Sequence, residues 1–397
     1  HAEAHNNLGV MLQELGRLKE AEASYGQAIT LKPDYAEAHN NLGIMLQELG
    51  RSDEAETNYR KAITLKPDHA EAHNNLGVML QELGRLEEAM NAYNRAIELN
   101  PHLFESHWNL LDLLTSYAPQ EEASHPFIKI NQKIKKIYLK EKTSGIISDD
   151  KIIHLFCKSL STIKEHDLEL GTDLSQVYRR NSIDLNCKRH LTIFNKFNVI
   201  PKFCFGCYKV QVEPKSILEL IKLVVVFDQI KLVENNTRKC MVEMRPEISG
   251  FYKGLIYCSS LEEAYQIANY LKIVVKENIR PGLHITIKRG CSEYAISFPD
   301  YKAINKSGAQ LMNYNEEWKS IEEDYDSLSS IKSNKIITPS LSGLNLQDVL
   351  IIRNWIDYAK GIGDPSVYLL NKNIVFSQKI YKSAKTRIEK HPWREFV

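Results

Sequence analysis

Residues 2–9 read AEAHNNLG, and the same eight letters return at 36–43 and at 70–77. A weaker copy, FESHWNLL, occupies 104–111. The copies are therefore 34 residues apart, a spacing typical of one supersecondary unit that repeats. A single unit is too small to bury its own apolar side, so we expect the copies to stack into a solenoid with a shared core.

The apolar residues of each copy predict two helices separated by a glycine turn. In the first copy Leu8 and Leu12 recur at helical spacing, Gly16 interrupts the pattern, and a second apolar stripe follows. The residues at matching positions are Gly9, Ala21, Tyr25, Ala28 and Pro33, then Gly43, Ala55, Tyr59, Ala62 and Pro67, and then Gly77, Ala89, Tyr93, Ala96 and Pro101. This pattern resembles the tetratricopeptide repeat (TPR) family over residues 2–118, as three repeats and a capping helix.

One asparagine occupies the same phase of every copy, as Asn7, Asn41, Asn75 and Asn109. This phase resembles the asparagine ladder of the O-linked N-acetylglucosamine transferase family, which implies a row of amides that contact the backbone of an extended peptide. A carboxamide suits that role because it offers both donors and an acceptor. The alternative is that these asparagines simply follow a duplicated consensus, since neighbouring glutamine and glutamate residues are repeated as well.

Charge divides the chain into an acidic first part and a basic remainder. Residues 1–118 contain 9 Lys and Arg against 18 Asp and Glu, which gives 9 − 18 = −9, and the remainder contains 42 against 32, which gives 42 − 32 = +10. The asymmetry favours different partners for the two parts. Apolar residues make up 43%, which excludes a largely disordered chain, and no apolar run is long enough to span a membrane.

A candidate metal site lies between residues 187 and 207. The spacing is Cys187-x2-His190 and Cys204-x2-Cys207, with 13 residues between the two pairs. Such a set predicts a structural Zn²⁺ site of the zinc-knuckle kind. We expect Gly206 to supply a left-handed turn between the last two ligands.

Other roles for these thiols stay open. Seven cysteines are too few, and odd in number, for a disulfide scaffold, so we expect a reducing, cytoplasmic setting. The alternatives to zinc are a redox Cys-x2-Cys, buried thiols without metal, and an iron–sulfur cluster. The cluster would need Cys240, Cys258 or Cys291 in place of His190.

Residues 208–299 predict two helices and four strands in the order β-α-β-β-α-β, which is the ferredoxin-like order. Residues 252–271 weakly resemble RNA-recognition motifs, through Lys253, Gly254 and the aromatic Tyr257. Cations near the predicted strand ends favour an anion site. They are Arg245, Lys253, Lys288 and Arg289. The partner would be nucleic acid or another polyanion, although solvated strand ends explain the same residues.

The sequence therefore predicts an α+β multidomain protein in four parts. These are the TPR array (1–118), a helical connector (119–186), a zinc-knuckle and ferredoxin-like domain (187–299) and a C-terminal helical region (300–397). Because the chain begins at His1, inside a repeat, we expect a fragment. We expect a peptide-binding adaptor whose basic part contacts a second, anionic partner. The alternative is a transferase-like enzyme that modifies a peptide delivered by the groove, although no catalytic motif identifies one.

Overall fold

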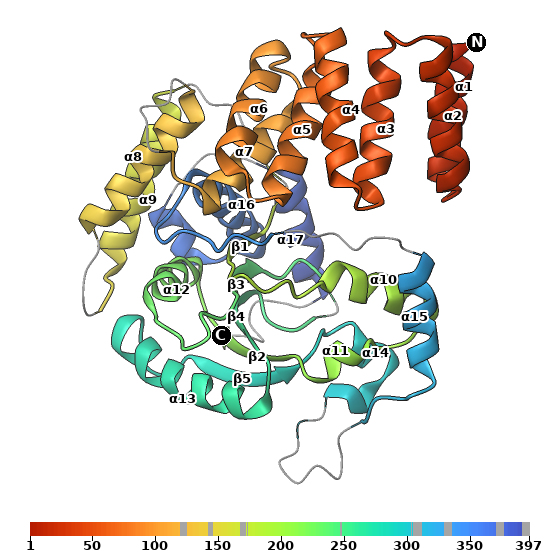
Figure 1. Ribbon diagram of the computed structural model, residues 1–397. Coiled ribbons are helices and arrows are strands. Elements are labelled where there is room, and N and C mark those ends of the chain that lie inside the picture. Colours follow the sequence, from red (N-terminus) through yellow and green to blue (C-terminus); the bar gives the residue numbers. More distant parts are fainter. Residues whose placement is uncertain are drawn as a thin grey trace. The chain divides into compact units, whose positions relative to one another are not determined.

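The computed structural model describes residues 1–119, 125–141, 146–166, 172, 174–246, 248–302, 304, 312–328, 336–370 and 377–390. The chain forms two compact units (Figure 1). We call them the repeat unit, residues 1–121 and 323–338, and the sheet unit, residues 122–322 and 339–397. Helix α15 (Trp318–Leu328) contains the boundary at residue 323. None of the described helices is long and apolar enough to cross a membrane.

The repeats form a helical solenoid, as their period predicts. Helices of similar length alternate along the chain, and each pairs with the next (Figure 1). Their bounds are α1 (Ala2–Glu14), α2 (Leu18–Leu31), α3 (Ala36–Glu48), α4 (Ser52–Leu65), α5 (Ala70–Glu82), α6 (Leu86–Leu99) and α7 (Phe104–Ser116). The first helix of one repeat also packs against the first helix of the next, so α1, α3, α5 and α7 make one continuous surface of the solenoid.

A glycine sets how closely the two helices of each repeat approach. A Cβ atom added at Gly43 would lie only 2.7 Å from Cε1 of Tyr59, which is too short for any real contact. The same contact joins Gly9 to Tyr25 and Gly77 to Tyr93. Each tyrosine ring is buried, so the pair of a glycine and a large flat ring fixes the crossing of the two helices.

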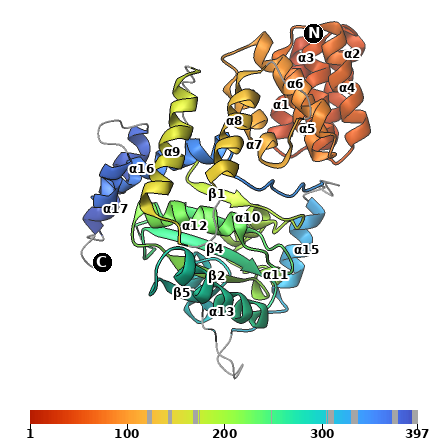
Figure 2. The same cartoon turned by 90° about the vertical axis from the view of Figure 1, so that its left-hand side faces the viewer.

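The sheet unit contains a five-stranded antiparallel sheet and several helices. Its strands are β1 (Gln176–Arg179), β2 (Tyr208–Glu213), β3 (Arg238–Val242), β4 (Tyr252–Cys258) and β5 (His284–Arg289). Its helices are α8 (Pro126–Glu141), α9 (Asp149–Lys164), α10 (Cys187–Phe197), α11 (Lys202–Phe205), α12 (Ile217–Gln229), α13 (Leu261–Asn278), α14 (Tyr294–Ser297), α16 (Leu346–Ile362) and α17 (Gln378–Lys390), with 3-10 turns η1 (Pro299–Lys302) and η2 (Pro365–Leu369). Helices α16 and α17 lie side by side (Figure 2).

The strand order is β1-β3-β4-β2-β5, and all neighbours are antiparallel. Between residues 208 and 289 the elements follow one another as β2-α12-β3-β4-α13-β5, at the places that the sequence predicts. Strand β1 was not expected, because it lies in the stretch predicted as a helical connector. It extends the sheet by pairing with β3, so that Val177 faces Cys240.

The two faces of the sheet differ in chemistry. Helices α12 and α13 pack on one face, where a Cβ at Gly254 would overlap Leu223 of α12. Side chains alternate along a strand, so the residues on either side of Gly254 point to the opposite face. We call that opposite face the lysine face. Its four lysines are Lys209 of β2, Lys239 of β3, Lys253 of β4 and Lys288 of β5.

One buried arginine connects strand β1 to two helices. Nε of Arg179 lies 2.7 Å from Oδ1 of Asp228 on α12, and Nη2 lies 2.9 Å from Oδ2 of Asp348 on α16. All three side chains are less than a tenth exposed. Buried charges persist only when they are paired and hydrogen-bonded, so this cluster ties the edge strand to the helical layer.

Candidate peptide groove, metal site and cation clusters

The four predicted groove asparagines lie on the first helices of their repeats, and Asn41, Asn75 and Asn109 each bond to the preceding repeat. Nδ2 of Asn41 donates to Oδ1 of Asn6 at 3.0 Å, and Nδ2 of Asn75 donates to Oδ1 of Asn40 at 3.1 Å. Asn109 donates to Asn74 in the same way, at 2.9 Å. The acceptors are buried, whereas Asn41, Asn75 and Asn109 are partly exposed and Asn7 is exposed. The sequence phase thus corresponds to a continuous row of amides.

A second ladder, which the sequence analysis did not assign, explains the repeated glutamines. In the second repeat, the Tyr59 hydroxyl donates to Oε1 of Gln47 at 2.9 Å, and Nε2 of Gln47 donates to Glu82 of the next repeat at 2.9 Å. The same chain runs from Tyr25 through Gln13 to Glu48, and from Tyr93 through Gln81 to Asp112. These glutamines are repeated because each one links two repeats.

The repeat unit also has a cavity away from the asparagine row. It measures about 500 Å³ and is formed by α4, α5 and α6. Its lining residues are Arg60, Ile63, Thr64, His73, Leu76, Leu80, Glu88, Asn91, Ala92 and Arg95. None of the four groove asparagines lines it. Two of these lining residues form an ion pair, with Nη2 of Arg60 3.5 Å from Oε2 of Glu88. The charge of Arg60 is therefore already partly neutralised.

Three of the four predicted zinc ligands lie on two helices, and the fourth lies in the chain between a helix and a strand. Cys187 and His190 lie on α10, Cys204 lies on α11, and Cys207 directly precedes β2. Within the described part of the chain, no group of three or more His, Cys, Asp or Glu residues is placed so that it could hold a metal ion. Gly206 has φ −93°, so the expectation of a left-handed turn there is wrong. The zinc site itself stays a prediction.

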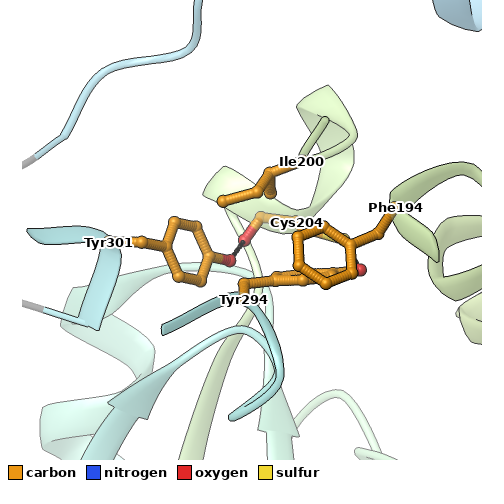
Figure 3. Packing of buried hydrophobic residues seen from close by; sticks show 5 residues of the cluster. All are labelled: Phe194, Ile200, Cys204, Tyr294 and Tyr301. Atoms are coloured by element: carbon orange, nitrogen blue, oxygen red, sulfur yellow. Dashed lines mark hydrogen bonds between the residues drawn. The ribbon is translucent and has the colours of Figure 1, made fainter. Parts of the chain in front are cut away.

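Local contacts explain the positions of the ligand candidates. The His190 ring stacks on Phe203, with 5.1 Å between the ring centroids. Cys204 lies in an aromatic cluster with Phe194, Tyr294 and Tyr301 (Figure 3). Its Sγ is 3.4 Å from the Tyr294 hydroxyl, and its carbonyl accepts a hydrogen bond from the Tyr301 hydroxyl at 2.6 Å. Burial raises the pKa of Cys204 to about 12 and that of Cys207 to about 11, so both are neutral thiols here.

The predicted anion site is organised around a buried carboxylate. Lys253 Nζ lies 2.9 Å from Oε2 of Glu243, and Arg245 Nε lies 2.8 Å from its Oε1. Arg245 also pairs with Glu293. Although burial favours protonation, the bonds from Arg245 and Lys253 lower the pKa of Glu243 to about 2. Burial lowers the pKa of Lys253 to about 8.

The other two predicted cations have different surroundings. Burial lowers the pKa of Lys288, against the influence of Glu213 and Glu243. Arg289 donates to the carbonyls of Phe205 and Met312 at 3.2 and 2.9 Å. The four predicted residues are therefore bound to carboxylates or carbonyls or lie near acidic groups. Whether they bind an external anion stays a prediction.

A second cation cluster on the lysine face has neutral partners in place of carboxylates. Nζ of Lys209 lies 5.0 Å and Nζ of Lys239 6.0 Å from the centroid of the Tyr257 ring. Lys239 donates to Oε1 of Gln176 at 3.0 Å and to the Tyr178 hydroxyl at 3.4 Å. Lys209 donates to Sγ of Cys291 at 3.4 Å. The strand alternation could have revealed the pairing of Lys209 with Tyr257, but Tyr178 belongs to the unexpected strand.

The comparisons with known proteins concern the repeats alone. A tetratricopeptide repeat model matches residues 1–68 and 34–101. The first TPR of Spaghetti (RPAP3), solved with an HSP90 peptide, is 25% identical, covers 28% of this chain and 89% of its own, and has a TM-score of 0.28. The Arabidopsis OM64 TPR domain is 23% identical, with 28% and 93% covered and a TM-score of 0.27. The second TPR domain of human RPAP3, with an HSP70 peptide, is 21% identical with the same coverage and TM-score.

No curated protein matches the chain in sequence. The match over residues 1–101 nevertheless agrees with the period, the helix pairs and the glycine–tyrosine contacts. The N-terminal part of the chain is a tetratricopeptide repeat array.

Proposed function

We propose that the protein is a peptide-binding adaptor. The TPR array would hold an extended peptide along the surface formed by α1, α3, α5 and α7. The observation that carries this proposal is the row of partly exposed amides. Each of Asn41, Asn75 and Asn109 uses one N–H to bond to the preceding repeat. A carboxamide has a second N–H and a carbonyl oxygen, so each of these partly exposed residues keeps polar groups with which a peptide backbone can bond, once in every repeat.

The test compares two double variants of the full chain. We expect Asn41→Ala with Asn75→Ala to weaken the binding of a peptide selected on this protein from a random library. A net hydrogen bond is worth about 0.5–1.5 kcal/mol, so two lost bonds correspond to roughly tenfold. The matched control is Asn6→Ala with Asn40→Ala, which removes the acceptors of Asn41 and Asn75 but leaves their amides. Equal affinity losses in calorimetry would mean that the ladder only stabilises the array.

For the sheet unit, we propose contact with a second, anionic partner. The net charge of +10 beyond residue 118 supports this role, because a basic surface attracts polyanions. The element order supports a ferredoxin-like fold, on which many functions occur. The runner-up is a transferase-like enzyme that modifies the bound peptide, and the buried, strongly shifted groups around Glu243 favour it.

We also propose that Cys187, His190, Cys204 and Cys207 bind one zinc ion after their side chains rearrange. Elemental analysis of protein purified without added metal tests this directly. About one zinc per chain, lost in Cys204→Ser but kept in Cys258→Ser, is the expected result. Iron in a coloured protein would favour the cluster that uses another cysteine in place of His190. Absence of any metal would leave buried thiols as the correct interpretation.

A further inference from the structure

The lysine face has two ends with opposite charge balance. At one end Glu243 binds Lys253 and Arg245, and Glu213 lies 3.3 Å from His284. At the other end, around Tyr178 and Tyr257, the cations contact only neutral groups among the described residues. Three cations share this second end: Lys209, Lys239 and Arg180.

Aromatic rings hold these cations in place. The guanidinium carbon of Arg180 lies 5.2 Å from the centroid of the Tyr178 ring, and Nζ of Lys239 lies 5.4 Å from the same centroid. Lys209 and Lys239 both lie over Tyr257. The negative face of a tyrosine ring attracts a cation that lies over it. The rings therefore orient the cations, but they do not neutralise them.

Burial makes this arrangement costly without a counter-charge. Lys209 is 8% exposed, and its only hydrogen-bond partner among the described residues is the Cys291 thiol. Removing an ammonium group from water is expensive unless an opposite charge pairs with it. Lys253, which is also buried, has such a partner in Glu243. Lys288, the cross-strand neighbour of Lys209, lies near Glu213 and Glu243. Among the described residues no carboxylate forms an ion pair with Lys209, Lys239 or Arg180, and an external anion would supply the missing negative charge.

We propose that Lys209, Lys239 and Arg180 form the binding site for a multiply charged oxyanion of the phosphate-ester or pyrophosphate class. Three cations match a phosphate or pyrophosphate group better than a single carboxylate, and Arg and Lys are the residues that bind phosphate oxygens most strongly. The Tyr178 hydroxyl accepts from Lys239 at 3.4 Å and donates to Oε1 of Gln176 at 2.6 Å, so it helps to hold Lys239 in place. This inference rests on the proposed contact between the sheet unit and an anionic partner, and it replaces Arg245, Lys253, Lys288 and Arg289 as the centre of that contact.

The experiment titrates the full-length protein with pyrophosphate in a calorimeter at low ionic strength. We expect Lys239→Met and Arg180→Gln each to weaken binding at least about tenfold, since each removes a charged hydrogen-bond donor to the anion. Both side chains are at least partly exposed, so the fold should survive, and circular dichroism checks this. The matched control is Lys272→Met, which removes the same charge from an exposed position on α13, the helix on the other face of the sheet.

The outcomes separate this site from the broader proposal. Binding that is lost in Lys239→Met and Arg180→Gln but kept in Lys272→Met supports the site. Binding of pyrophosphate and of single-stranded RNA that none of the variants changes overturns the site and leaves an anionic partner elsewhere on the unit. Absence of any anion binding overturns both. If RNA binds far more tightly than pyrophosphate and loses affinity in the same variants, the natural ligand is a nucleic acid backbone. If pyrophosphate binds as tightly as RNA, the natural ligand is a small molecule that carries phosphate.

Discussion

At the scale of single residues, glycine has two opposite roles in the repeats. Gly43 lies where a methyl group would collide with the Tyr59 ring, whereas an added Cβ at Gly26 would meet no atom within 4 Å. Both residues lie inside helices. The sequence alone distinguishes them only by recurrence, because Gly43 has counterparts in the other repeats and Gly26 does not.

The first prediction compares these two glycines. Gly43→Ala should lower the free energy of unfolding of the repeat unit by about 1–3 kcal/mol, because an overpacked core must shift. Gly26→Ala should raise it by roughly 0.5–1 kcal/mol, since alanine favours a helix interior over glycine. Urea unfolding followed by far-UV circular dichroism measures both. Stabilisation by both substitutions would show that Tyr59 can move aside without cost.

Sequence predicted the repeat residues well and the site residues less well. The repeated asparagines were identified from their phase, but their bonds to Asn6, Asn40 and Asn74 were not. These bonds join residues 35 positions apart, and such a contact depends on the solenoid geometry, which periodicity does not contain. Likewise, a spacing of Cys and His residues predicts possible ligands, but it does not show whether their side chains meet.

At the scale of elements, hydrogen-bond chains connect one repeat to the next. Each glutamine accepts from a tyrosine of its own repeat and donates to a carboxylate of the following one. Arginines at the start of the second helices add ion pairs between repeats, such as Arg51 with Glu22 and Arg85 with Glu56 at 2.7 Å. These pairs are partly exposed and contribute little each, so the glutamine chain is the more important connection.

The second prediction removes one link of that chain. Gln47→Leu keeps the size of the side chain but removes the bonds to both Tyr59 and Glu82. At about 0.5–1.5 kcal/mol for each bond, the free energy of unfolding of the repeat unit should fall by roughly 1–3 kcal/mol. Gln27→Leu is the control, because Gln27 is exposed and surface substitutions usually change stability by less than about 0.5 kcal/mol. Equal stability of the two variants would contradict a structural role for the ladder.

The elements of the sheet unit were predictable to different degrees. The alternating strands are local patterns, and so is the N-cap of α13, where the Ser260 hydroxyl accepts from the Glu263 amide at 3.1 Å. Strand β1 could not, because its four residues gain their strand character from pairing with β3, far away in the sequence. Tertiary pairing decides the structure of so short a segment.

At the scale of the whole molecule, the two units differ in how deeply their ion pairs are buried. Ion pairs of the repeat unit are partly exposed, as between Arg85 and Glu88. The sheet unit buries Glu243 with Lys253, and Arg179 with Asp228 and Asp348. Acid should therefore destabilise the sheet unit through Glu243, because its bonds to Arg245 and Lys253 lower its pKa and its protonation in the folded state weakens them.

The third prediction is a pH dependence of the sheet unit. Glu243 has a folded pKa of about 2, against about 4.3 when unfolded. Its ionised form therefore stabilises the fold above about pH 4.3, and that contribution is lost as the pH falls towards 2. The shift corresponds to about 3 kcal/mol at most. Lys253 stays protonated throughout this range. Hydrogen exchange of the β3 and β4 amides at pH 6 and pH 3 measures the effect.

The matched variant for that experiment is Glu243→Gln with Lys253→Met, which removes both charges of the pair. We expect a smaller loss of protection between pH 6 and pH 3 than in the natural sequence. An unchanged loss would assign the acid sensitivity to another carboxylate of the sheet unit whose pKa is lowered, such as Glu263, which accepts hydrogen bonds from Asn236 and Ser259.

The Arg179 cluster has a consequence for how the protein is made on the ribosome. Asp348 is 169 residues beyond Arg179, so strand β1 is synthesised long before its second carboxylate exists. The TPR helices need only near neighbours and can fold as they emerge, since domains fold as units and the N-terminal one folds first. The sheet unit, in contrast, needs both Asp228 and Asp348 to neutralise the buried Arg179. Asp348 lies on α16, so this cluster cannot form until α16 has left the exit tunnel. For a substantial part of translation, a nascent chain therefore carries a folded repeat array followed by a sheet unit that is not yet complete.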